Sequence, residues 1–123
     1  MDKTVKVVNI KNKLELFKDT WSPKILGDIN DCQVKAVKLD GPFHWHHHEK
    51  EDEMFLVVKG KLTMHLRDKD LEIDEGEFVI IPRLVEHMPE AQDEVHVLLF
   101  EPKGTLNTGN IKSDKTVEKL ERI

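Results

Sequence analysis

The chain lacks several features that would place it in other classes of protein. Its single cysteine, Cys32, cannot form an internal disulfide. No apolar run is long enough for a leader peptide or a membrane span, so we expect neither. There is also no repeat of fixed period, no low-complexity tract and no linker that would divide the chain. These absences predict one soluble cytoplasmic domain over residues 1–123, with a core of ordinary size for that length.

Positive charge is not in excess either. The 19 lysines and arginines are outnumbered by 24 aspartates and glutamates, and the net charge is −5. Nucleic acids and anionic membranes both bind to basic surfaces, because those surfaces neutralise their negative charge. We therefore expect neither nucleic acid nor a membrane as a partner.

Helical periodicity is almost absent from the chain, and short apolar runs alternate with turn-forming residues. This pattern is typical of an antiparallel β-sandwich or β-barrel, with a core over about residues 24–102. The runs predict strands at 24–29, 32–39, 53–58, 61–67, 71–74, 77–82 and 94–101, with a polar loop at 89–93.

Both ends of the chain are expected to pack outside this barrel. Val5, Val7 and Val8 predict a short N-terminal strand that pairs at an edge. Near the other end, Ser113 or Asp114 could cap a short C-terminal helix. Such a helix is too short to be stable alone, so it would pack on the barrel wall.

Residues 32–39 contain two further signals. Their apolar parity changes between Ala36 and Val37, which predicts a β-bulge. Lys35 and Lys38 in the same run are expected to be solvated, because lysine is seldom fully buried.

A β-hairpin is predicted from residues 53–58 and 61–67, closed at Gly60 by a tight turn. The period of two puts Glu53 on the same face as Phe55 and the other apolar residues of both strands. Glu53 would thus point into the interior, where a bare carboxylate is costly to bury. A bound cation is one partner that could compensate its charge.

Four of the seven histidines lie within five positions, at 44 and 46–48. On an extended chain His46 and His48 share a face and His47 turns away. Two imidazoles beside Glu53 are ligand types that a divalent transition metal prefers, and His87 is a further candidate along the chain. The alternative is a surface histidine tract with incidental metal affinity, but that tract would not require Glu53 or His87.

Two motifs in this region resemble those of the cupin superfamily, specifically its small single-domain members of the cupin 2 type. The first reads His46-x-His48, four residues, Glu53, six residues, Gly60; the second reads Gly76, five residues, Pro82, four residues, His87. The segment from Glu101 to Gly109 resembles the Glu-Pro-x-Gly-Thr-x-Asn-Thr-Gly segment into which the last strand runs in one cupin subgroup. Leu84 departs from the pattern, where glycine is common; if its φ is positive, leucine costs about 1 kcal/mol there.

The resemblance implies an all-β fold, a double-stranded β-helix or jelly-roll barrel. It also implies that His46, His48, Glu53 and His87 bind one divalent ion, with zinc, manganese, iron, nickel and copper all compatible. His44, Phe55 and His96 are weaker candidates for the wall of a substrate pocket. Small cupins commonly dimerise through edge strands, so a homodimer is expected.

Two functions are compatible with such a centre. One is an enzyme that transforms a small polar metabolite by isomerase-type or dioxygenase-type chemistry. The other is a non-catalytic protein that binds or senses a small molecule at its metal. No residue is assigned as catalytic, and no phosphate-binding loop is present in the sequence.

Overall fold

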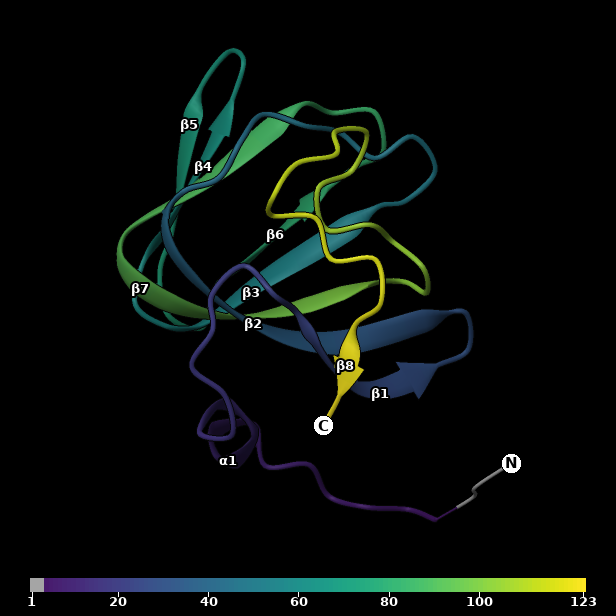
Figure 1. Ribbon diagram of the computed structural model, residues 1–123. Coiled ribbons are helices and arrows are strands. Elements are labelled where there is room, and N and C mark those ends of the chain that lie inside the picture. Colours follow the sequence, from purple (N-terminus) through teal and green to yellow (C-terminus); the bar gives the residue numbers. More distant parts are fainter. Residues whose placement is uncertain (1–3) are drawn as a thin grey trace.

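The computed structural model describes residues 4–123, and strands account for most of its regular structure (Figure 1). In chain order the elements are α1 (Ile10–Leu14), β1 (Lys24–Ile29), β2 (Cys32–Pro42), β3 (Glu53–Lys59), β4 (Leu62–Leu66), β5 (Asp70–Ile73), β6 (Phe78–Ile81), β7 (His87–Pro102) and β8 (Glu121–Arg122). The strands pair in the order β5-β4-β7-β2-β1-β8, and β3 joins β7 to β6. The molecule is a jelly-roll barrel, as the sequence predicts.

Strand β7 connects the barrel because it pairs with three other strands. It runs antiparallel to β2 along most of its length, to β4 near its start and to β3 near its end. Residues 89–93, predicted as a polar loop, therefore belong to this strand, and that prediction is wrong. Glu90 pairs with both Pro42 and Thr63, so backbone hydrogen bonding from two neighbouring strands keeps this polar stretch extended.

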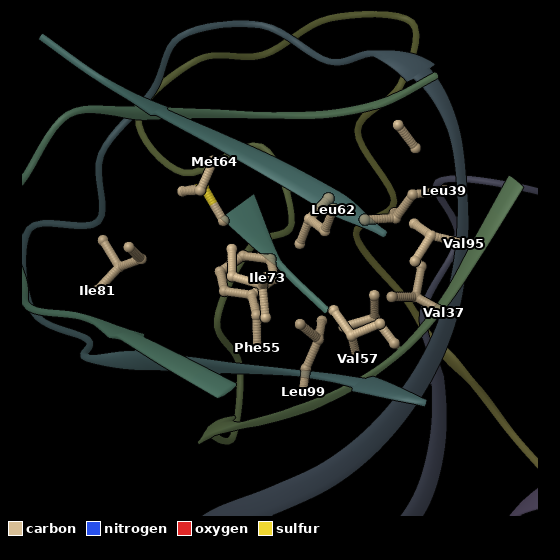
Figure 2. Packing of buried hydrophobic residues seen from close by; sticks show 12 residues of the cluster. Val37, Leu39, Phe55, Val57, Leu62, Met64, Ile73, Ile81, Val95 and Leu99 are labelled. Atoms are coloured by element: carbon tan, nitrogen blue, oxygen red, sulfur yellow. The ribbon is translucent and has the colours of Figure 1, made fainter. Parts of the chain in front are cut away.

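The interior of the barrel is apolar and closely packed, as Figure 2 shows. Alternate residues of β3 and β4 point into it: Phe55, Val57, Leu62 and Met64 are at most 5% exposed. The predicted inward face of these two strands is thus confirmed. Burial of such side chains stabilises the fold by about 25 cal/mol per Å² of apolar surface removed from water.

The predicted pairing of those strands is wrong. β3 pairs with β6 and β7, whereas β4 pairs with β5 and β7. Gly60 has the positive φ of +94° expected at a tight turn. The turn at this glycine leads the chain from β3 into a strand with other partners, so a short connection does not close a hairpin here.

A second apolar cluster covers the outer face of β2 and β7. Leu14 and Phe17, from α1 and the residues after it, pack against Ala36 and Leu98. Ala36 and Val37 are therefore both buried, one under this cover and one in the barrel. Burial on both faces of the strand explains why the apolar parity changes between Ala36 and Val37. No bulge forms at that position; the register between β2 and β7 shifts at Leu39–Gly41 instead.

The two ends differ from the prediction. Residues 4–9 form no strand, and Val5 and Val7 are almost fully exposed. The C-terminal helix is not formed: residues 111–120 are turns and irregular chain that lead to β8. The side chain of Asn107 bonds the carbonyl of Lys115 and the amide of Val117, which engages backbone groups that a helix would need. No helix in the described chain has the length and apolarity to cross a membrane.

Candidate metal centre

Two short segments bring the histidines together at one end of the barrel. His46 and His87 form an isolated β-bridge, in which each backbone amide donates to the other residue's carbonyl at 3.0 and 2.9 Å. Alternation along the first segment then puts His46 and His48 on the inner side, where each is at most 4% exposed. His87 begins β7 and is fully buried.

Glu53 is the first residue of β3, and it pairs with Ile81 of β6. Its side chain points inward with that of Phe55 and is only 4% exposed as a residue. One carboxylate oxygen, Oε1, lies 3.2 Å from Nε2 of His48 and 3.6 Å from Nε2 of His87. One donor atom from each of His46, His48, Glu53 and His87 can be chosen so that all four lie within 4.8 Å of one another.

Backbone carbonyls orient two of the imidazoles. Nδ1 of His46 donates to the carbonyl of His44 at 3.0 Å, and Nδ1 of His87 donates to that of Val85 at 2.9 Å. These bonds leave the Nε2 lone pairs of both rings free to face the cluster. His44 therefore contributes to the centre through its backbone.

Several of the clustered atoms are buried and have no hydrogen-bond partner within residues 4–123. They are both ring nitrogens of His48, Nε2 of His87 and Oε1 of Glu53. Such groups are rare in proteins, because an unsatisfied buried polar atom costs about 1–3 kcal/mol. A divalent cation bound between one ring nitrogen of His48, Nε2 of His87 and Oε1 of Glu53 would satisfy three of these four atoms, so the residues present fit a metal ion.

The protonation states also suit a metal. Burial lowers the pKa of His46 from 6.5 to about 3, and the nearby His87 adds to the shift. Burial alone would raise the pKa of the Glu53 carboxyl, but the imidazoles of His48 and His87, together with the adjacent Glu101 side chain, outweigh it and hold that pKa well below its usual range. A neutral imidazole and an ionised carboxylate are the forms that coordinate metals.

A buried ion pair lies next to Glu53, and no local pattern in the sequence indicated it. Nζ of Lys35 is 2.9 Å from Oε1 of Glu101, and both side chains are at most 2% exposed. Burial raises the pKa of Glu101, and the charge of Glu53 raises it further, while Lys35 opposes the shift. Lys38 is also buried and donates to the carbonyl of Phe17, so the expectation that both lysines are solvated is wrong.

The C-terminal segment packs directly on the segment that carries the histidines. The backbone amide of Asn110 donates to the carbonyl of His47, and the side-chain oxygen of Asn110 accepts from the backbone amide of His47. Gly109 has a φ of +60°, and a Cβ there would overlap the carbonyl of His47 and lie 2.8 Å from Cδ2 of His46. Only glycine permits this approach of the segment to the centre.

Gly109→Ala is therefore expected to displace the segment and disturb the His46 ring, which would lower both the melting temperature and the affinity for Co²⁺. Gly104→Ala is the matched control, because Gly104 has a φ of +78° and, apart from its two chain neighbours, no atom of the described chain lies within 4 Å of where the added methyl would stand. Thermal unfolding and Co²⁺ titration of both variants check this. Equal losses in the two variants would contradict the packing argument, since backbone strain alone would then explain them.

A small cavity of about 30 Å³ adjoins the cluster, bounded by His46 and Glu53 on one side. Of the three candidates for a pocket wall, Phe55 lines this cavity, and the side chains of His44 and His96 do not. His44 stacks on Phe43 with ring centroids 4.3 Å apart. His96 pairs with Glu94 beside a separate groove next to α1. Trp21, which no sequence motif indicated, completes part of the cavity wall. Asn107 also lines it; this residue lies in the Glu101 to Gly109 segment, whose resemblance assigned it no role.

A jelly-roll barrel with three buried histidines and a glutamate at one end is the arrangement of a metal-binding cupin. The chain belongs to the cupin family, since residues 35–101 match the cupin domain. Leu84 has a φ of +71°, so the residue that departs from the cupin motif does adopt the backbone that favours glycine.

Known proteins resemble this chain over different extents. A cupin-2 domain protein from Shewanella frigidimarina of known structure is 40% identical, with a TM-score of 0.78 over 79% of this chain and 95% of that one. YdbB of Bacillus subtilis is 30% identical over 50% of this chain. A 3-hydroxyanthranilate 3,4-dioxygenase of Xenopus tropicalis is 26% identical over 76% of this chain. The matches span 56% of the length of YdbB and 36% of that of the dioxygenase.

Proposed function

We propose that this protein binds one divalent transition metal ion through His46, His48, Glu53 and His87. The observation that carries the proposal is the convergence of buried donor atoms, several of which lack a hydrogen-bond partner in the described chain. Zinc, manganese, iron, nickel and copper all accept this mixed set of nitrogen and oxygen donors, so the donors leave the metal's identity open.

We further propose that the centre acts on a small molecule by dioxygenase-type chemistry. Such a metal, when bound, supplies a Lewis acid and, if it is iron, a redox-active site. The chain's own part is to hold the imidazoles through the His44 and Val85 carbonyls and to surround the site with apolar side chains.

The cavity wall favours this class over isomerase-type chemistry. An isomerase that moves a proton needs a general acid or base within reach of its substrate. Among the described residues that line the cavity, only His46 and Glu53 can exchange protons, and both belong to the proposed metal ligands. Glu101, whose pKa is raised, contacts Glu53 but does not line the cavity and is paired with Lys35. The likeness to the Xenopus dioxygenase agrees with this choice.

The test uses protein loaded anaerobically with Fe²⁺, then mixed with 3-hydroxyanthranilate or catechol and exposed to oxygen. We expect oxygen uptake that requires both iron and an organic substrate and that is lost in Glu53→Gln. A spectral change on ligand binding without oxygen uptake would instead favour the metal-dependent binding or sensing function. No spectral change and no uptake with either probe would contradict dioxygenase-type chemistry on this class of substrate.

A further inference from the structure

The cavity beside the candidate metal centre has apolar walls on the barrel side. Val37 and Leu39 of β2, Phe55 of β3 and Leu99 of β7 point into it from the core. Each of these side chains is at most 5% exposed, so the walls belong to the packed interior. A ligand in this space would contact carbon atoms that hold well-defined positions.

An aromatic wall closes another side. Trp21 and Phe43 stack with ring centroids 4.5 Å apart and an interplanar angle of 11°. The indole of Trp21 donates to the carbonyl of Asp40, and its backbone amide donates to that of Lys38. The Trp21 side chain therefore needs no polar partner from a ligand.

Polar groups that could receive a hydrophilic ligand are scarce. The Asn107 side chain faces the cavity, but its Nδ2 already bonds the carbonyls of Trp21 and Lys115, and its Oδ1 accepts from Val117. Lys115 lies over the rings of Trp21 and Phe43, and its ammonium group donates to the carbonyl of Pro42. Within the part of the chain that the structure describes, no lysine or arginine side chain lines the cavity.

The space is also small. A cavity of about 30 Å³ has room for about two water molecules, since one water needs roughly 10–15 Å³ by this measure. Only a few non-hydrogen atoms of a ligand can occupy it without movement of the walls. The cavity is therefore matched to a short apolar group.

We propose that the natural ligand of this centre is a compact, largely apolar molecule that presents one or two oxygen donors to the cluster and carries no phosphate or polyol chain. The inference rests on the proposed metal site and names the class of molecule that it receives. Phosphate and hydroxyl groups would lose their water in the cavity and find no free donor or cation among its described lining residues. An apolar group would gain from burial against Leu39, Phe55 and Leu99.

A series of α-hydroxy acids tests this, because each member presents the same chelating group and differs only in its side chain. Co²⁺-loaded protein is titrated with glycolate, 2-hydroxybutyrate, glycerate and 3-phosphoglycerate, and the visible absorption of the cobalt reports binding. We expect 2-hydroxybutyrate to bind roughly tenfold more tightly than glycolate, for two added methylene groups. Glycerate and 3-phosphoglycerate should bind no more tightly than glycolate.

A pair of variants locates the effect in the cavity. Phe55→Leu should shift the binding preference toward the longer 2-hydroxyhexanoate, because the smaller side chain enlarges the cavity. Phe78→Leu should leave the preference unchanged. Phe78 is the control because it lies on the outer face and is 59% exposed. Tighter binding of glycerate or 3-phosphoglycerate, or equal behaviour of the two variants, would overturn the inference and leave the metal site standing. Failure of Co²⁺ to bind at all would overturn the proposed function as well.

Discussion

Replacement of His87 by alanine is expected to weaken metal binding by at least about 100-fold, because it removes one of four buried donors. Glu53→Gln should have a similar effect, since it removes the only carboxylate among them. Equilibrium dialysis against Co²⁺ or Zn²⁺, followed by metal analysis, measures both losses. Protein without an affinity tag is needed, because added histidines would bind metal themselves.

The informative control is His47→Ala. His47 lies between two proposed ligands in the sequence, but its neighbours on either side, His46 and His48, are the ones that face the cluster. If the histidines acted as an incidental surface tract, loss of His47 would weaken binding as much as loss of His87. We expect His47→Ala to keep its metal, and the opposite result would contradict the proposed centre.

The folding stability of the metal-free protein is expected to fall between pH 7 and pH 5, and His46 is the main reason. His46 has a pKa of about 3 in the folded chain against 6.5 when unfolded. Between these values the unfolded chain takes up a proton that the folded chain does not, so folding stability falls as pH falls. From pH 7 to pH 5 this one residue is expected to cost about 2 kcal/mol.

Urea unfolding of the metal-free protein at pH 7 and pH 5 measures the loss, with His46→Gln as the comparison. Between pH 7 and pH 5 the variant should lose about 2 kcal/mol less unfolding free energy than the wild-type protein, since glutamine does not titrate. Addition of metal at about 1,000 times its Kd should stabilise the wild-type protein by about 4 kcal/mol at pH 7. Equal pH dependence in the two proteins would contradict the assigned state of His46.

Local patterns in the sequence predicted the face of each strand better than its partners. Alternation placed Glu53, Phe55 and Met64 correctly, because side-chain direction follows from the period of two alone. The partner of β3 depends on residues far along the chain, and a short turn at Gly60 suggested a hairpin that does not form. Pairing is a tertiary property, and local signals constrain it weakly.

The same limit explains the buried lysines. Lys35 is buried because Glu101, 66 residues later, lies beside it, and Lys38 because Phe17 covers it. A run that alternates apolar and basic residues is normally half-solvated, so no local feature distinguishes this case. The candidate ligands could be predicted from the sequence because the motif spacing encodes them. Trp21 comes from a segment without a motif, and the resemblance of Glu101 to Gly109 did not indicate that Asn107 lines the cavity.

Other properties stay predictions. The single domain over residues 1–123, the cytoplasmic location and the homodimer follow from composition and resemblance, and each needs its own measurement.

The central claim is that three imidazoles and one carboxylate hold a single metal ion at one end of the barrel. X-ray absorption spectroscopy of tag-free protein, together with its metal content, tests it most directly. We predict one metal per chain, with three imidazole nitrogens and at least one oxygen in its coordination shell, and loss of one imidazole in His87→Ala. A shell without imidazole, or one unchanged in His87→Ala, would contradict the claim.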